Sequence, residues 1–224
     1  MSGAAALEVA RPVGREGKKR APGPERLVKP LVFLGALSPL LWLIGRGVLG
    51  RLGADPVSEI LNRLGLYALV LLLCSLACTP LQLVLGWKWP LRVRRMLGLF
   101  AFFYATIHLS TYVGIDQGLD FAGIWQDIVK RKFMTIGFAA WCCLAPLAVT
   151  STQGWVKRLG FRRWKALHRL AYVAGGLAIV HFVWRFKTAL LEPLVAGGVL
   201  FILLAVRVIV RKSPARLGAN PRAG

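Results

Sequence analysis

Residues 166–184 read ALHRLAYVAGGLAIVHFVW, an apolar run with a histidine near each of its ends, His168 and His181. An α-helix needs about 20 apolar residues to cross about 30 Å of hydrocarbon. A segment of this kind in lipid is helical, because lipid offers no hydrogen-bond partner to a free backbone group. The run therefore predicts a membrane-spanning helix.

Five further apolar runs of similar length surround this one. They cover residues 31–47, 65–85, 96–115, 133–150 and 190–209. The chain is thus expected to be an all-α membrane protein, a bundle of six transmembrane helices over residues 30–210. Residues 1–29 lack an apolar stretch and are rich in Pro, Gly, Lys and Arg, which predicts a disordered basic tail. Residues 211–224 form a second predicted tail.

Composition and charge support a membrane protein and argue against nucleic-acid binding. Hydrophobic residues make up 56% of the 224 residues, above the roughly 45–50% typical of soluble domains. The net charge of +21 would suit nucleic acid, but the Lys and Arg residues gather at the ends of the apolar runs. Of the 30 basic residues, 22 fall on the side that holds both chain ends. Because the more basic side faces the cytoplasm, both termini are predicted to be cytoplasmic.

The three histidines, His108, His168 and His181, all lie inside predicted spans. At 1.5 Å per residue, His108 is about 18 Å and His181 about 22 Å along helices that enter from the cytoplasm. The two imidazoles should therefore face each other at similar depth in the outer half of the membrane. Two neutral imidazoles in an apolar bundle are suitable axial ligands for haem b iron. The alternative is that each histidine bonds a neighbouring helix.

His168 is expected near the cytoplasmic surface, opposite Arg94 and Arg95. Membrane cytochromes with two stacked haems often carry two histidines 13 or 14 residues apart on each helix. His168 and His181 satisfy this spacing, but arginines stand where the third span would need its second histidine. Arginine pairs with carboxylate or phosphate, so this inner site suits a haem propionate, a flavin phosphate or a second haem. Alternatively, the two arginines only set the orientation of the helix.

Six short motifs together resemble the haem-binding membrane subunit of the bacterial protein-methionine-sulfoxide reductase system, within the ferric-reductase-like transmembrane group. The motifs are LGADPV (52–57), RRMLGL (94–99), TIHLSTY (106–112), TSTQ (150–153), RWKALH (163–168) and VHFVW (180–184). The resemblance runs from about residue 30 to residue 210. One departure is the apolar start of the second span, LGLYAL (64–69), where a more polar sequence is expected.

The resemblance implies a redox subunit that is not catalytic by itself, located in the bacterial cell inner membrane. Such subunits pass electrons from quinol through haem b and FMN to a periplasmic molybdopterin-containing subunit that reduces methionine sulfoxide in proteins. By the match, His108, His168 and His181 are the functional histidines and Arg94 is the motif arginine.

Two other functions are compatible with the residues alone. One is a stand-alone transmembrane ferric or oxygen reductase fed by a separate flavin reductase. The other is a cofactor-free transporter that relays protons through its histidines, although such proteins usually also place carboxylates in mid-span.

Overall fold

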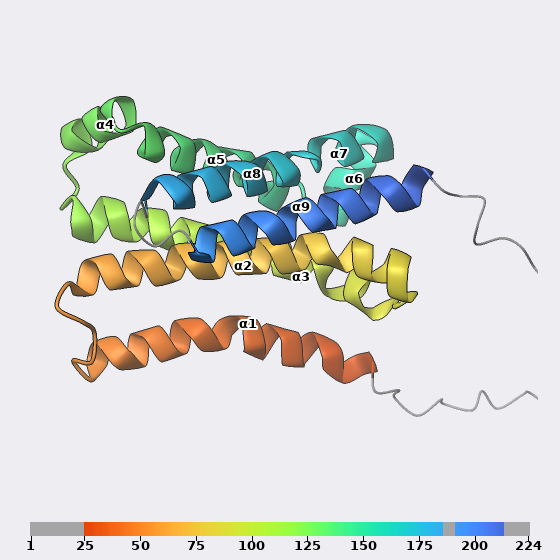
Figure 1. Ribbon diagram of the computed structural model, residues 1–224, viewed down its shortest axis with the longest axis horizontal. Coiled ribbons are helices and arrows are strands. Elements are labelled where there is room, and N and C mark those ends of the chain that lie inside the picture. Colours follow the sequence, from red (N-terminus) through yellow and green to blue (C-terminus); the bar gives the residue numbers. More distant parts are fainter. Residues whose placement is uncertain (1–24, 186–190, 213–224) are drawn as a thin grey trace, which may run out of the picture.

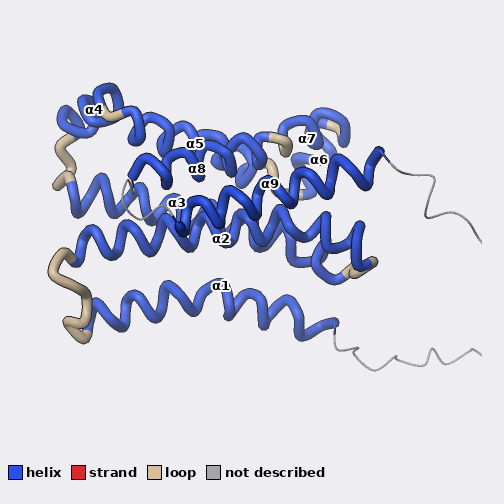
Figure 2. Tube along the Cα trace, in the orientation of Figure 1, coloured by secondary structure: helices blue, strands red, loops and turns tan. Residues whose placement is uncertain are grey.

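The computed structural model describes residues 25–185 and 191–212, and this part of the chain is helical and contains no strand. In chain order, its elements are α1 (Glu25–Val48), α2 (Pro56–Leu85), α3 (Trp89–Thr111), the π-helix η1 (Tyr112–Asp116), α4 (Phe121–Lys130), α5 (Lys132–Val149), α6 (Gln153–Leu159), α7 (Phe161–Leu167), α8 (Leu170–Arg185) and α9 (Leu191–Lys212). The long helices lie roughly side by side, and the described loops gather toward the two ends of the bundle (Figures 1 and 2).

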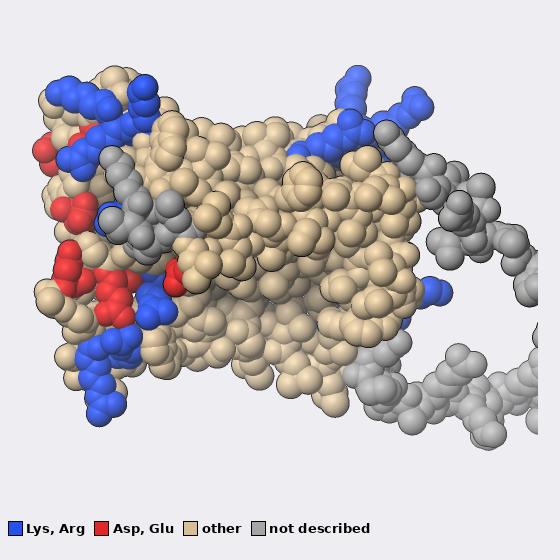
Figure 3. Space-filling view, in the orientation of Figure 1, with Lys and Arg blue, Asp and Glu red and all other residues tan. Residues whose placement is uncertain are grey.

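Six segments of the described chain are long and apolar enough to cross a membrane, as the sequence predicted. They are Leu27–Val48, Pro56–Leu85, Trp89–Asp116, Lys132–Val149, Phe161–Arg185 and Leu191–Val210. In Figure 3 an uncharged belt separates two ends that carry charged side chains. The chain is therefore a multi-pass membrane protein.

Several helices are longer than the apolar runs indicated. The second begins at Pro56 rather than at residue 65, and the third at Trp89 rather than at residue 96. Their added turns carry polar residues, which hydropathy alone does not assign to a span. The first helix begins at Glu25, so residues 25–29, predicted to belong to the tail, are helical. The rest of the predicted tails, residues 1–24 and 213–224, lies outside the described residues.

The central helix is α2, which packs against α3, α8 and α9, while α5 packs against α8. Leucines of α2 meet small residues of the neighbouring helices, and this close packing forms the main core. The buried members are Leu69, Leu72, Leu73, Leu76, Ala101, Leu144, Leu147, Ala171, Ala174, Ala196 and Leu200.

The start of α2 is fixed by a local sequence signal. Asp55 precedes Pro56 and accepts a hydrogen bond from the Ser58 backbone N–H at 3.0 Å, so it caps the helix N-terminus. Hydrogen bonds from Ser58 lower the pKa of Asp55 below its ordinary value. The helix ends at Leu85 and is capped by Gly86, whose φ of +71° is most easily adopted by a residue without Cβ.

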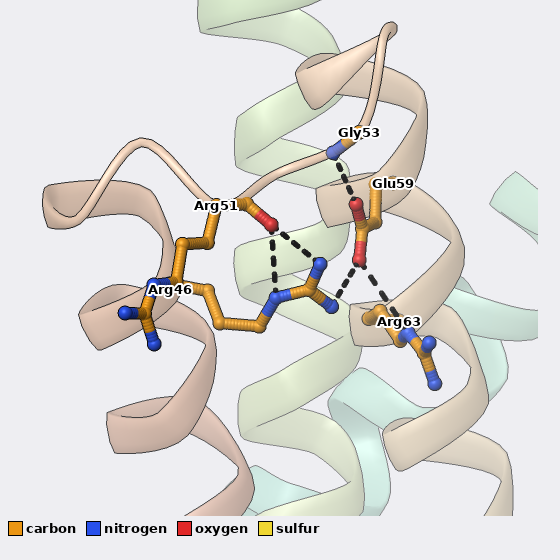
Figure 4. Close-up of polar contacts among 5 residues, drawn as sticks. All are labelled: Arg46, Arg51, Gly53, Glu59 and Arg63. Atoms are coloured by element: carbon orange, nitrogen blue, oxygen red, sulfur yellow. Dashed lines mark hydrogen bonds and ion pairs between the residues drawn. The ribbon is translucent and has the colours of Figure 1, made fainter.

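A polar network joins the end of α1 to the start of α2 (Figure 4). Arg46 Nη1 lies 2.6 Å from Glu59 Oε1, and the Gly53 N–H donates to Glu59 Oε2 at 2.8 Å. Arg46 also donates through Nε and Nη2 to the Arg51 carbonyl, at 3.2 and 2.5 Å. Because one carboxylate and one guanidinium bond the loop and both helices, they fix the loop against the bundle.

Tyr104 of α3 attaches α1 to the bundle by entering its backbone hydrogen-bond ladder. Its fully buried hydroxyl donates to the Ala36 carbonyl at 2.8 Å and accepts from the Leu40 N–H at 3.1 Å. These two backbone groups are four residues apart and would otherwise bond each other. The insertion lies beside Pro39, which removes a further ladder donor.

Candidate functional site

All carboxylates whose side chains are described lie at one end of the bundle, which we call the acidic end (Figure 3). It contains Asp55, Glu59, Asp116, Asp120, Asp127 and Glu192. The opposite, basic end contains the α2–α3 junction, α6, α7 and the end of α9 (Figure 1). The start of α1 also lies there, so the two ends of the described chain are on one side of the bundle.

His108 of α3 and His181 of α8 meet near the acidic end. Their ring centres are 6.4 Å apart and their planes are nearly perpendicular, at 81°. The sequence predicted that these two side chains would face each other at similar depth, and the structure brings them together. Both are largely removed from the surface of the bundle.

Each of these imidazoles is held by a backbone carbonyl of a neighbouring helix. His108 Nδ1 lies 2.9 Å from the Leu61 carbonyl oxygen, and His181 Nδ1 lies 2.7 Å from that of Phe133. A carbonyl oxygen only accepts, so the proton of each neutral ring is on Nδ1 and the lone pair is on Nε2. Such Nδ1–carbonyl bonds are the usual way in which proteins orient metal-binding histidines.

Two glycines make these contacts possible. Gly65 follows Leu61 by four residues, and Gly137 follows Phe133 by four, so each lies one turn beyond the accepting carbonyl. A Cβ placed at Gly137 would be 2.7 Å from His181 Cε1, and one at Gly65 would be 3.4 Å from His108 Cε1. Sequence reasoning missed both glycines. By contrast, a Cβ at Gly176 of α8 would meet nothing within 4 Å.

The separation of the two rings matches that expected for a single metal between them. Two imidazoles on opposite sides of one metal, with metal–nitrogen bonds of about 2 Å, have ring centres about 6 Å apart. The observed separation of 6.4 Å agrees with this value. His108 and His181 could therefore serve as the two axial ligands of one haem iron.

His168 lies elsewhere, in the turn between α7 and α8, and thus not within an uninterrupted helix as the sequence suggested. Its Nδ1 is 3.0 Å from the Trp164 carbonyl oxygen, and its ring packs on the Trp164 indole with 4.0 Å between centres. The same tautomer argument leaves Nε2 with its lone pair. His168 lines a cavity of about 680 Å³ at the basic end.

Arg94 and Arg95 line the same cavity, which we call the inner cavity. The sequence predicted that these two arginines would lie opposite His168. Arg94 Nη1 donates to Thr79 Oγ1 at 3.1 Å, and the Arg94 carbonyl accepts from Ser75 Oγ at 2.9 Å. The cavity volume falls in the range of ligand sites, roughly 300–1,000 Å³. Its walls are largely apolar.

Three further cationic residues and one tyrosine line the inner cavity, and sequence reasoning did not single them out. They are Lys165, Arg169, Tyr172 and Arg207. No described lining residue is acidic. The cavity could therefore hold a largely apolar molecule with anionic groups. Arg207 had a signal in the sequence, since it is a cation within the last apolar run, residues 190–209.

Comparisons of the amino-acid sequence with known proteins show which proteins this chain is similar to. The sequence model of the family described as "Ferric reductase like transmembrane component" matches residues 64–179. A protein of Rhodospirillum rubrum is 50% identical over 197 residues, covering 88% of this chain and 95% of its own. A protein of Xanthomonas axonopodis pv. citri is 46% identical over 205 residues, with coverage of 87% and 94%. One of Ralstonia nicotianae is 45% identical over 196 residues, with coverage of 87% and 90%. All three are named protein-methionine-sulfoxide reductase heme-binding subunit MsrQ.

Proposed function

Because the chain belongs to the ferric-reductase-like transmembrane family, and within it to the haem-binding subunits of protein-methionine-sulfoxide reductases, we propose that it holds haem b in the membrane and passes electrons to a reductase partner. In this proposal, His108 and His181 would hold the haem iron. The observation that carries it is the 6.4 Å separation of two imidazoles whose Nδ1 atoms are both engaged.

Haem b supplies reversible one-electron exchange at its iron, at a potential set by the axial ligands and their surroundings. The protein's task is to hold these ligands rigidly in a dry bundle. The Leu61 and Phe133 carbonyls fix the tautomer and the direction of each imidazole. Gly65 and Gly137 allow both rings to lie against the neighbouring helices.

The inner cavity is proposed to hold a second redox group, FMN or a further haem. His168, Arg94 and Arg95 would bind it. The cationic side chains in its otherwise largely apolar lining suit a flavin phosphate or haem propionates equally well. His168 and His181 both belong to the Phe161–Arg185 span, so the two sites lie one above the other across the membrane.

The proposed electron path begins at the quinone pool of a bacterial inner membrane and ends outside it. The acceptor is a periplasmic molybdopterin-containing subunit that reduces methionine sulfoxide in proteins. The acidic end faces this partner in the proposal, with both termini in the cytoplasm. The support is the distribution of Lys and Arg, because more of the described basic residues lie at the basic end than at the acidic end, and the more basic side of a membrane protein usually faces the cytoplasm.

Spectroscopy of the purified full-length chain in detergent tests the haem proposal. Wild-type protein should show reduced-minus-oxidised bands of a six-coordinate haem b, and a pyridine haemochrome assay should give the haem content. His108→Ala and His181→Ala should each abolish the six-coordinate spectrum. His168→Ala is the matched control and should retain it. A folded wild-type protein without haem would reject the proposal, and equal loss in all three variants would reject the ligand assignment.

A further inference from the structure

Arg207 is a cation within the last membrane span. It lies on α9 in the apolar segment Leu191–Val210, and it lines the inner cavity. Its guanidinium carbon is 5.1 Å from the centre of the Tyr172 ring. Charged residues inside spans are rare and usually face a functional cavity.

Tyr172 of α8 brings an unsatisfied polar atom to the same place. Its hydroxyl oxygen is buried and has no hydrogen-bond partner among the described residues. Tyr172 follows His168 by four residues and also lines the cavity. A buried hydroxyl without a partner is costly, so this one is expected to be satisfied by a bound molecule.

The surroundings select an anionic group for this position. Arg94 and Arg95, which lie on a different helix, α3, also line the cavity. No described lining residue carries a carboxylate. The acidic residue described on α9 is Glu192, which lies 15 residues before Arg207, or about 22 Å along the helix axis. The N–H donors along the edge of a guanidinium match the planar geometry of a carboxylate or phosphate.

We propose that Arg207 and Tyr172 form an anion clamp in the inner cavity, which binds an acidic group of the molecule held there. This inference rests on the proposed function, because it assumes an occupant of the inner site. The clamp includes α9, which lies outside the residues matched by the family model. The acidic group is a carboxylate if the occupant is a tetrapyrrole, and a phosphate if it is a flavin.

Pairs of probes that differ only in the acidic group test the clamp. FMN is compared with riboflavin, and hemin with its dimethyl ester, by titration into full-length protein in detergent. Binding is followed by flavin fluorescence and by Soret absorbance. The variants are Arg207→Gln, Arg207→Lys and Tyr172→Phe. The control is Arg162→Gln, which removes an exposed charge from the same end but outside the cavity.

Arg207→Gln should weaken binding of the acidic probe by about tenfold or more and leave its neutral counterpart nearly unchanged. Tyr172→Phe should give a smaller loss with the same preference, and Arg207→Lys an intermediate one. Arg162→Gln should match wild type. Retention of the His108–His181 haem spectrum checks folding in each sample. If Arg207→Gln does not fold, Tyr172→Phe, which removes one oxygen, decides.

Equally weakened binding of the acidic and the neutral probe would overturn the clamp, because a residue with only a structural role would affect the binding of both. Unchanged binding of the acidic probe would overturn it as well. If wild type takes up no probe beyond the outer haem, the inner-site part of the proposed function fails, and the clamp fails with it. The outer haem spectrum reports separately on the rest of the proposed function.

Discussion

Gly137 lies directly against the imidazole of His181: a Cβ at this glycine would be 2.7 Å from both Nδ1 and Cε1 of the ring. The corresponding glycine beneath His108 is Gly65, where a Cβ would be 3.4 Å from Cε1. The first distance is too short for any real contact, whereas the second needs only a small shift. The two otherwise similar positions thus differ in how tightly the imidazole is packed.

Gly137→Ala is expected to displace His181 and to weaken haem binding strongly. Overpacking of this kind costs about 1–3 kcal/mol, which corresponds to an affinity loss of about five- to 150-fold. Gly65→Ala should cause a much smaller loss. The haem-to-protein ratio after purification and the Kd from hemin titration measure both effects.

Gly176→Ala is the control for these variants, because a Cβ there meets no atom within 4 Å. It should bind haem as wild type does. Equal effects of Gly137→Ala and Gly176→Ala would show that helix flexibility, and not the space beneath the imidazole, is what matters.

Tyr104→Phe is expected to loosen α1 from the bundle. The substitution removes the hydroxyl that bonds both the Ala36 carbonyl and the Leu40 N–H. Loss of a buried hydrogen-bonding group costs about 1–3 kcal/mol. Thermal denaturation in detergent, with limited proteolysis between α1 and α2, measures the change.

Tyr67→Phe provides the comparison for Tyr104. The Tyr67 ring packs edge-on to that of Tyr104 at 5.7 Å, but its hydroxyl does not enter the α1 ladder. It should leave the melting temperature nearly unchanged. A Tyr104→Phe protein as stable as Tyr67→Phe would mean that Ala36 and Leu40 simply restore their helical bond.

Cysteine labelling in whole cells tests the proposed orientation. Asp116→Cys places a thiol at the acidic end, and Arg162→Cys, on α7, places one at the basic end. A membrane-impermeant maleimide should label the first in intact cells and the second only after permeabilisation. The wild-type chain, with its four native cysteines, is the blank. The reverse pattern would contradict cytoplasmic termini.

Hydropathy and spacing were sufficient to predict the spans and the meeting of His108 with His181. Both can be derived from one helix at a time: the length of an apolar run predicts a span, and the number of residues from its start predicts the depth of a side chain. The true start of α2 at Pro56 was not predicted, because its first turns are polar and are stabilised by the Asp55 cap and the Glu59 pairing with Arg46.

Features that depend on contacts between helices could not be predicted from the sequence. A glycine in an apolar run has no side chain to indicate a role, so Gly65 and Gly137 became visible only beside their histidines. The contribution of Arg207 and Tyr172 to the inner cavity needs the contact between α8 and α9. The break at His168 arises in the turn after α7, within a segment that is apolar enough to be read as continuous.

If each of the two sites holds a redox group, as proposed, their separation across the membrane would make electron transfer between them responsive to voltage. His168 and His181 are 13 residues apart, or about 20 Å along a helix, which is roughly two thirds of a hydrocarbon layer of about 30 Å. In the proposed orientation, an electron moving from the inner to the outer site travels toward the positive side of the membrane. A full crossing corresponds to about 2.3 kcal/mol per 100 mV, so this step would gain about 1.5 kcal/mol per 100 mV. An energised membrane would thus drive reducing equivalents outward, and a depolarised one would slow their export.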